Sequence, residues 1–402
     1  MSINPMKIVI ITPNYAPEQG ACAERVRHLA EFLHKKGHTI LVITALPNYP
    51  TGKIFSTYAK TFHATEVINE ITVLRYWLLP SHSKNLFFRL LAMLSLALTT
   101  LFSLPKIIKF KPTLVYVQSP PLFLALSGYI IAKLCKAKFW LNLSDLWSSV
   151  LLDLGIISTS FIYKSIQQLE FFLYKKAYLL SGQSQEIVNF IQPIVVHSRV
   201  FLCRTGVDTE LFKPIYTKEP TKKIRFVYAG LLGIAQGVLD FCKQVSFPDE
   251  VELHIYGDGA ERMALTKYLS NNPTKPIFLH APLPQPILAT ILPTFDVALL
   301  MQRTTIYGTV PSKLYEAMAC GLLIVYVGGG EGQKLMQEFN LYHTLFQNSQ
   351  PVESIKEIIS LLYLNPTHSQ LYRKKAREVA VNQFDRGKIL EEFYKKMMEY
   401  VL

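Results

Sequence analysis

The stretch that decides the fold is KIVIITPNYAPEQGACAERVRHLAEFLHKKGHTILVIT, residues 7–44. It begins with a short β-branched run and continues through a Pro-containing loop. A helical pattern of apolar residues follows from Val26 and stops at Gly37, before a second β-branched run at 39–44. This order of strand, loop, helix and strand predicts the unit from which parallel sheets are built.

The same alternation continues along nearly the whole chain. In the first half it predicts strands at 71–78, 113–118 and 138–143, helices at 85–104, 122–135, 160–176 and 184–191, and a short strand between the last two helices. In the second half it predicts strands at 224–229, 251–256, 277–280, 296–300 and 322–327, with helices at 236–245, 260–270, 286–292 and 312–319. A polar stretch at 218–223 separates the halves. We expect two doubly wound α/β domains in series, with ranges set at 1–200 and 201–385.

Charge and hydropathy distinguish the first half from the second. The 402 residues carry a formal net charge of +13, although 50% are hydrophobic and only 18% are charged. Residues 1–200 hold 20 basic and 9 acidic side chains, whereas residues 201–402 hold 22 and 20. The apolar content excludes a disordered chain. A first half that is both basic and apolar favours contact with an anionic membrane surface over nucleic acid.

Cysteine usage and the start of the chain bear on location. The five cysteines are scattered and form no CxxC pair, so neither a zinc site nor a disulfide framework is indicated. A strand is predicted almost at once, at residue 7, with no signal-peptide pattern before it. We therefore expect a cytoplasmic protein without a bound metal or cofactor.

The apolar segment 85–110 leaves three possibilities open. Residues 90–105 carry no charge, which gives about 24 Å of helix, whereas a bilayer core of about 30 Å needs roughly 20 residues. Basic residues flank the segment on both sides. A buried domain helix and a helix that dips into the membrane surface are the main alternatives, and a transmembrane span is the third.

Two candidate sites follow strands of the first half. In open parallel sheets ligands bind beyond the carboxyl ends of the strands, so the loops there, and a cleft between two such domains, are where we expect function. The loop 13–25 contains Gly20 and ends at Arg25 in the first helical turn, a position suited to an anion, although an ordinary strand-to-helix turn explains it equally well. We include Gly20 and Arg25 among the donor-binding candidates. Asp145 follows strand 138–143 and is either a catalytic carboxylate or the N-cap of the next segment.

The first loop of the second half is rich in glycine. Gly230, Gly233 and Gly237, with Gln236 between them, allow a tight strand-to-helix turn. Backbone N–H groups of such a turn can hold a diphosphate. The Walker pattern GxxxxGK[ST] is absent, so ATPase and GTPase chemistry is not supported.

The segment GTVPSKLYEAMACG, residues 308–321, has the most specific pattern. Ser312 and Lys313 lie in the first turn of a predicted helix, where free N–H groups, the helix dipole and the ammonium suit a diphosphate. Glu316 lies one turn later, where its carboxylate can accept hydrogen bonds from sugar hydroxyls. The alternative is a capped helix with a solvated Lys–Glu surface. A further glycine run opens another helix at Glu331, which we include among the donor-binding candidates.

Seven segments in order resemble the family-4 glycosyltransferases of GT-B type, and most closely their bacterial O-antigen and exopolysaccharide branch typified by N-acetylfucosaminyl transferases. The resemblance covers nearly the whole chain. It rests on the segments NYAPE at 14–18, LPNYPTGK at 46–53, QSPPLF at 118–123, SDLW at 144–147, GVD at 206–208, AQG at 235–237 and PSKLYEAMA at 311–319.

The resemblance implies two facing Rossmann-like domains with a deep cleft, and a last helix, 386–402, that crosses back onto the first domain. It implies a retaining, metal-independent transfer from a nucleotide-sugar donor, UDP-linked, bound by the second domain. The carboxylate at Glu316 would hold the ribose, and Ser312, Lys313 and the 230–237 loop the diphosphate. The acceptor would be a polyprenyl-diphosphate-linked glycan, and the protein would lie peripherally on the inner face of the cytoplasmic membrane.

Departures from the family pattern keep other functions open. Gly308 stands where many relatives have a second glutamate, Ser148 replaces a proline, and Ile234 and Gln236 stand in a loop where many relatives have Arg or Lys. A non-catalytic assembly partner with a degenerate transferase fold is one alternative. A sugar-nucleotide epimerase on the same fold is another.

Overall fold

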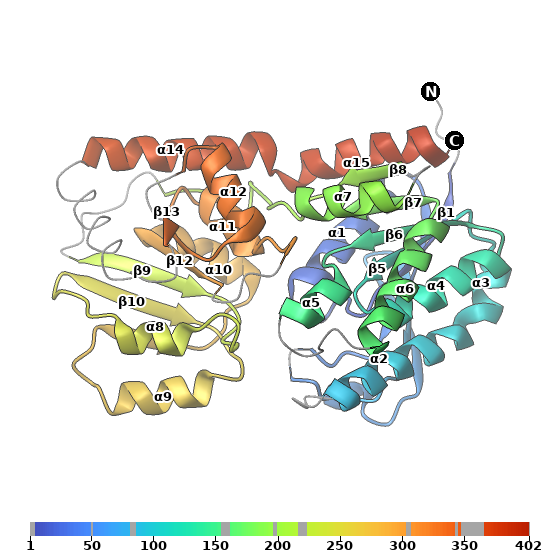
Figure 1. The fold of residues 1–402 in the computed structure, drawn as a ribbon, viewed down its shortest axis with the longest axis horizontal. Helices are drawn as coiled ribbons and strands as arrows, with labels where there is room; N and C mark the ends of the chain where they lie inside the picture. Colours follow the sequence, from blue (N-terminus) through green and yellow to red (C-terminus); the bar gives the residue numbers. More distant parts are fainter. Residues whose placement is uncertain are drawn as a thin grey trace. The chain divides into compact units, whose positions relative to one another are not determined.

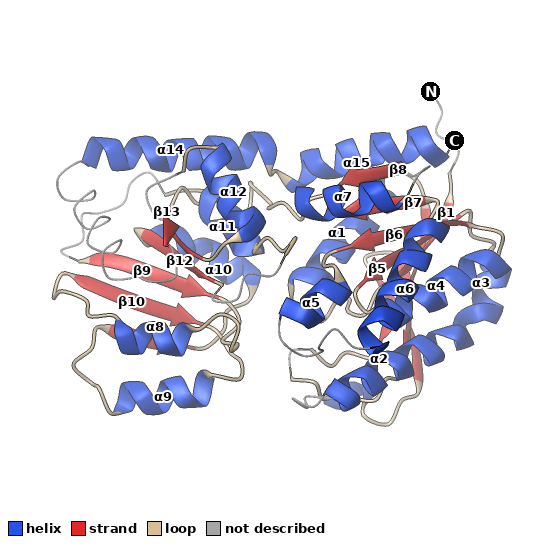
Figure 2. Cartoon of the chain, viewed as in Figure 1, coloured by secondary structure: helices blue, strands red, loops and turns tan. Residues whose placement is uncertain are grey.

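The computed structural model forms two compact units. It describes residues 5–49, 51–80, 86–153, 161–195, 199–215, 223–302, 307–341, 345–346 and 366–401. The first unit contains Met1–Arg204 and Leu390–Leu402, and the second contains Thr205–Ile389 (Figure 1). In each unit helices cover both faces of one sheet, with a separate hydrophobic cluster on each face (Figure 2).

The first unit contains an eight-stranded sheet in the order β3-β4-β2-β1-β5-β6-β7-β8. All neighbouring pairs are parallel except β3 and β4. The strands are β1 (Lys7–Ile11), β2 (Thr39–Ala45), β3 (His63–Ile68), β4 (Ile71–Tyr76), β5 (Leu114–Ser119), β6 (Lys138–Leu143), β7 (Leu179–Gly182) and β8 (Arg199–Leu202). The central strands bury almost every residue because helices cover both faces.

Helices of the first unit lie on opposite faces of this sheet. They are α1 (Ala21–Lys35), η1 (Ser56–Tyr58), α2 (Leu86–Thr100), η2 (Leu101–Ser103), α3 (Leu104–Phe110), α4 (Leu122–Leu134), α5 (Trp147–Asp153), α6 (Phe161–Lys176), α7 (Gln185–Ile191), η3 (Gln192–Ile194) and α15 (Arg386–Val401). Apolar residues of α1 and α15 share one cluster, and those of α2, α4 and α6 share the other.

The second unit contains a six-stranded sheet in the order β11-β10-β9-β12-β13-β14, with parallel pairs throughout. Its strands are β9 (Ile224–Ala229), β10 (Val251–Tyr256), β11 (Ile277–His280), β12 (Val297–Met301), β13 (Leu323–Val327) and β14 (Leu345–Phe346). Its helices are α8 (Val238–Gln244), α9 (Arg262–Ser270), α10 (Gln285–Ile291), η4 (Leu292–Thr294), α11 (Ser312–Ala319), α12 (Gly330–Glu338) and α14 (Pro366–Gln383).

The predicted class, two parallel-sheet Rossmann-like domains, is confirmed, and the sequence missed two strands, β3 and β14. The β3 strand is an antiparallel edge strand whose residues alternate between half-buried and exposed, so its sequence lacks the apolar run of a central strand. It turns into β4 at Asn69 and Glu70, both with positive φ. The polar stretch predicted as the boundary, 218–223, lies outside the described residues except for Lys223.

The apolar segment forms a crossover helix of the first unit. The stretch Leu90–Phe110 is long and apolar enough to cross a membrane. Its most apolar 18 residues have a mean hydropathy of 1.8, and 33% of them are buried. Polar side chains fix α2 in place: Ser95 Oγ accepts from Leu79 N at 2.8 Å, and Thr99 Oγ1 donates to the Trp77 carbonyl at 2.6 Å. Its inner side packs on α4, where Ser127 Oγ donates to the Ala97 carbonyl at 2.8 Å.

The outer side of the same segment is apolar and exposed. Leu94, Leu98 and Phe102 follow one another at four-residue intervals, and the ring of Phe62 lies 5.9 Å from that of Phe102. We call these four residues the apolar strip. One side of this helix packs in the core, as the domain-helix alternative predicts. The other side exposes the apolar strip, which that alternative does not explain.

The last helix, α15, packs on the first unit. Its Phe393 ring stacks on Trp140 of β6 at a centroid distance of 4.3 Å. Tyr394 forms a hydrogen bond of 2.9 Å with His38, and Lys36 forms an ion pair of 2.6 Å with Glu391. The chain therefore ends against the unit in which it began.

Candidate functional site

The carboxyl ends of β9, β12 and β13 lie side by side in the second sheet, because these strands are parallel neighbours. The loops that follow them begin at Gly230, Gln302 and Gly328, and α11 begins at Ser312. The structure therefore places the donor-binding candidates of the second half at one edge of one sheet, where doubly wound folds bind ligands.

The loop after β9 is folded tightly onto the loop after β10. Leu232 N donates to the Asp258 carbonyl at 2.8 Å, and Tyr228 Oη donates to the Leu231 carbonyl at 2.6 Å. A Cβ at Gly257 would lie 2.1 Å from the Gly230 carbonyl oxygen, so only glycine fits there. The close packing fixes the path of the 230–237 backbone.

The predicted glycines of this loop have distinct roles. Gly237 has φ 69° and is the N-cap residue of α8, a conformation that favours glycine. A Cβ at Gly233 would lie 2.5 Å from Gln236 Oε1, because the Gln236 side chain folds back over it. Leu231 and Ile234 are exposed instead. The loop thus presents backbone and apolar side chains at this edge.

Helix α11 supplies the charged pair of the second unit. Pro311 is its N-cap residue, in an extended conformation, and forms no side-chain hydrogen bond to its first N–H groups. Lys313 Nζ lies 3.1 Å from Glu316 Oε2 in an ion pair. Glu316 is buried, whereas Lys313 is half-buried. A carboxylate and a cation therefore lie together within the first two turns of a helix whose N-terminus attracts anions.

Gly308 shows why the second glutamate of the family pattern is missing. Its φ is 82°, in the left-handed region that β-carbon-bearing residues rarely adopt, and the residue is buried. In this backbone conformation a glutamate would be strained. The path into α11 therefore requires a glycine where many relatives carry a carboxylate.

The loop after β13 completes the edge. Tyr326 Oη donates to Gln302 Oε1 at 3.0 Å, so the ends of β12 and β13 are joined by side chains. A Cβ at Gly332 would lie 2.5 Å from Tyr326 Oη, which lets α12 approach closely. Glu331 is buried in the first turn of α12. Glu331 is therefore buried at this edge of the sheet rather than exposed on it.

In the first unit, Gly20 and Arg25 lie at the start of α1. A Cβ at Gly20 would lie 2.9 Å from Tyr49 Cε1, so glycine allows the Tyr49 ring to cover the helix start. Arg25 is half-buried, and its charge opposes the rise that burial causes in the pKa of Cys22 and Cys203. The positive charge of Arg25 therefore acts on two thiols, one in α1 and one that follows β8.

Asp145 follows β6 directly and is half-buried. The N-terminus of α5 is capped by another residue, the buried Glu170 of α6, which accepts from Trp147 N at 2.9 Å and from Ser148 Oγ at 2.5 Å. Glu170 therefore holds the first two residues of α5. Ser148, which replaces a family proline, supplies the hydroxyl that Glu170 binds.

Sequence reasoning missed a polar network beneath Asp145. Asn142 Nδ2 donates to Gln118 Oε1 at 2.8 Å, and Ser181 Oγ donates to Asn142 Oδ1 at 2.6 Å. Gln118 Nε2 in turn donates to Ser144 Oγ at 3.2 Å. The only signal was the occurrence of one polar residue near the end of each of three apolar strands. It also missed Glu18, whose contacts are described below.

The candidates thus form two groups, one for each unit. Gly20, Arg25 and Asp145 belong to the first sheet, and the remaining candidates to the second. Among the described residues, no group of three His, Cys, Asp or Glu side chains is arranged to hold a metal ion.

Comparisons with known proteins agree with this arrangement. Residues 223–363 match the family described as "Glycosyl transferases group 1". The chain is 26% identical to the "Putative colanic acid biosynthesis glycosyl transferase WcaI" of Escherichia coli K12, over 96% of this chain and 98% of that protein.

Solved structures of low sequence identity share the fold over almost the whole length. A sucrose-phosphate synthase from Thermosynechococcus elongatus matches with a TM-score of 0.74 at 14% identity, covering 98% of each chain. The HepE protein of Anabaena in complex with UDP matches with a TM-score of 0.68 at 14% identity, covering 98% of this chain and 100% of that one. The protein therefore has the GT-B fold, and its match to the glycosyltransferase group 1 family lies in the second unit.

Proposed function

We propose that this protein is a retaining glycosyltransferase that moves a sugar, an N-acetylated hexosamine, from a UDP-linked donor to a polyprenyl-diphosphate-linked glycan in the assembly of a surface polysaccharide. The name of the E. coli relative, a colanic acid biosynthesis transferase, supports the polysaccharide, and the HepE complex supports UDP. The observation that carries the proposal is the ion pair of Lys313 and Glu316 at the start of α11, at the carboxyl edge of the second sheet.

The proposed chemistry depends mainly on electrostatic stabilisation of the leaving diphosphate. The α11 N–H groups, the Lys313 ammonium and the backbone of the 230–237 loop would bind the diphosphate as its charge grows. Glu316 is fixed by its ion pair with Lys313 and would accept hydrogen bonds from the ribose hydroxyls. Asp145 would orient the acceptor hydroxyl from the first unit. In this scheme no step passes through a bound metal.

We further propose that the first unit works on the inner face of the cytoplasmic membrane. The apolar strip is exposed, and the exposed Lys106, Lys109 and Lys111 follow it along the same segment. A surface that joins apolar side chains to lysines is complementary to anionic lipid. Such a location brings the first unit to a lipid-linked acceptor.

A two-part experiment tests the transfer. Radiolabelled nucleotide-sugars are incubated singly with the protein and an E. coli membrane extract, and the lipid fraction is counted. UDP binding is measured by calorimetry for the wild type, for Glu316→Gln and for Glu338→Gln, an exposed glutamate at the end of α12. We expect one UDP-sugar to label lipid, and only Glu316→Gln to weaken UDP binding.

Gly308, which stands where many relatives have a glutamate, favours one second candidate, a non-catalytic assembly partner. That function requires no donor. If no UDP bound at millimolar concentration and no nucleotide-sugar labelled lipid, the transferase proposal would be refuted in favour of that alternative. A changed sugar nucleotide without labelled lipid would instead indicate an epimerase.

A further inference from the structure

The loop between β1 and α1 holds a buried carboxylate that binds two loops at once. Glu18 is 1% exposed. Its Oε1 accepts from Asn48 N at 2.9 Å, from Tyr49 N at 2.8 Å and from Asn14 Nδ2 at 3.1 Å. Its Oε2 accepts from Tyr15 N at 3.1 Å. One side chain therefore joins the loop after β1 to the loop after β2.

The hydrogen-bond donors around Glu18 indicate the protonation state of its carboxylate. All four groups around Glu18 are N–H donors, and an ionised carboxylate accepts from all of them without a proton of its own to place. Burial raises the pKa of Glu18, and the four hydrogen bonds oppose that rise. The arrangement therefore depends on the charged form.

A buried cation holds the same loop from its carbonyl side. Arg75 of β4 is fully buried and donates Nε to Glu66 Oε2 at 2.8 Å and Nη1 to the Ala45 carbonyl at 3.4 Å. Its Nη2 donates to the Ala16 carbonyl. We call Glu18 and Arg75 the charge clamp, because they bind a backbone N–H and a backbone carbonyl of one short loop.

The position of the clamp points to a binding role. Burying a charge costs several kcal/mol before its partners compensate, and a loop that only connects a strand to a helix has no need of one. The clamped loops follow β1 and β2 at the carboxyl edge of the first sheet, where such folds bind ligands. Sites there require supporting groups that fix the loops accurately.

We propose that Glu18, with Arg75, is a positioning residue for the sugar acceptor, holding loops 13–20 and 46–49 in the arrangement that the acceptor binds. The proposal rests on the proposed transferase function. The side chain acts through the loop backbone, and also holds Tyr49, whose ring covers Gly20 at the start of α1.

The test is the Glu18→Gln variant, whose amide NH₂ would face N–H donors. With the UDP-sugar found above and an E. coli membrane lipid extract as acceptor, we expect the acceptor KM to rise about 10²-fold, the effect of a misplacement of about 1 Å. The donor KM should stay at the wild-type value, because none of the four groups that Glu18 binds is a donor-binding candidate. All of those candidates except Gly20 and Arg25 belong to the second unit. A lysine at position 75 cannot make the three separate contacts of Arg75, so Arg75→Lys should also raise the acceptor KM.

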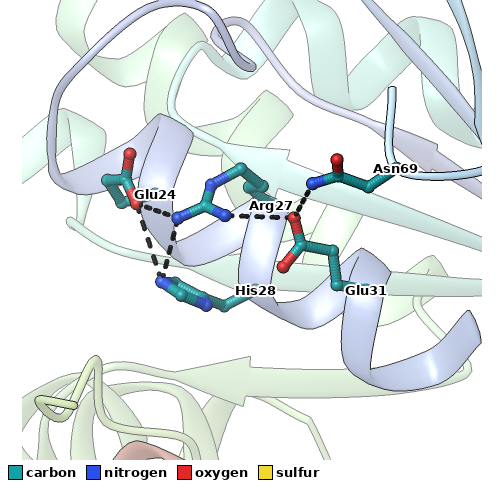
Figure 3. A network of polar contacts seen from close by, with 5 residues as sticks. All are labelled: Glu24, Arg27, His28, Glu31 and Asn69. Atoms are coloured by element: carbon teal, nitrogen blue, oxygen red, sulfur yellow. Dashed lines mark hydrogen bonds and ion pairs between the residues drawn. The ribbon is translucent and has the colours of Figure 1, made fainter. Parts of the chain in front are cut away.

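The control is Glu24→Gln, also a carboxylate near the start of α1 but half-exposed. Glu24 forms an ion pair of 2.6 Å with Arg27, which also binds Glu31, as Figure 3 shows. This network ties α1 to Asn69 of the β3–β4 turn. We expect Glu24→Gln to leave both KM values unchanged.

Hydrogen exchange of the amides of Tyr15, Asn48 and Tyr49 provides a readout without substrate. Faster exchange at these amides in Glu18→Gln, with a rise in the acceptor KM alone, supports the proposal. An unchanged acceptor KM, an equal rise in both KM values, or unchanged exchange overturns it. A wild-type protein that transfers no sugar refutes the proposed function instead, and exchange still decides whether the clamp holds the loops.

Discussion

At the scale of single residues, the first two turns of α11 concentrate the chemistry of the second unit. Lys313 and Glu316 are three residues apart, a spacing at which helical side chains meet, and they form the ion pair at 3.1 Å. The N-cap residue, Pro311, forms no side-chain hydrogen bond to the first N–H groups of the helix, and such groups bind anionic ligands or water. A diphosphate bound there would contact one cation whose position is set by a buried carboxylate.

Lys313→Ala tests that cation. We expect kcat/KM to fall about 10²–10³-fold, the usual effect of removing one key charge-stabilising donor. Steady-state kinetics with the UDP-sugar identified above measure the change. Lys243→Ala, at the exposed end of α8, is the matched control and should leave kcat/KM unchanged. Near wild-type turnover of Lys313→Ala would contradict its role.

At the scale of elements, the segment from α2 to α3 serves two environments. Its inner residues pack on the sheet and on α4, while Leu98 and Phe102 remain 56% and 65% exposed. A helix that is apolar on all sides is expected only where both of its sides are shielded from water. The membrane proposed above provides the second apolar environment.

Leu98→Asp combined with Phe102→Asp tests the apolar strip. Each buried apolar side chain contributes about 1.5–3 kcal/mol, so we expect the affinity for phosphatidylglycerol vesicles to fall at least about tenfold. Flotation measures it. Leu371→Asp, 62% exposed on α14 of the second unit, should leave flotation unchanged. Equal flotation of all variants, or none of the wild type in low salt, would rule out this surface.

At the scale of the whole molecule, one of the contacts that bind the last helix to the first unit is made by a histidine. His38 is buried, its Nδ1 accepts from Met6 N at 3.0 Å, and its Nε2 lies 2.9 Å from Tyr394 Oη. Because Nδ1 is an acceptor, the imidazole must be neutral here. Burial lowers the pKa of His38 below its usual value of 6.5.

A pH series tests this contact. In the unfolded state His38 binds a proton more readily than in the folded state, because folding lowers its pKa. The free energy of unfolding that His38 contributes is therefore fully present above its usual pKa and is lost as the pH falls below 6.5. We expect the free energy of unfolding in urea to fall from about pH 7 to pH 5 less steeply in His38→Gln than in the wild type. Tyr394→Phe should lose about 1 kcal/mol and keep the wild-type slope. Identical slopes in all three proteins would contradict the assignment.

Local sequence was enough for most elements and for the second-unit site. The β-branched runs and helical periods predicted nearly every strand and helix, and the segment 308–321 predicted a helix beginning at Ser312 that places Lys313 and Glu316 together. These features depend on residues within one or two turns of each other. The contacts that join distant segments were not predictable in this way.

What the sequence by itself determined is the pair of doubly wound domains and the motifs at their strand ends, because apolar periodicity and helix starts are local properties. Only the tertiary structure decided that Glu170 caps α5, that Glu18 and Arg75 clamp one loop, and that His38 meets Tyr394. These contacts join residues from separate elements, up to 356 positions apart for His38 and Tyr394. The register of neighbouring strands and the packing of helices bring them together, and no local pattern encodes either.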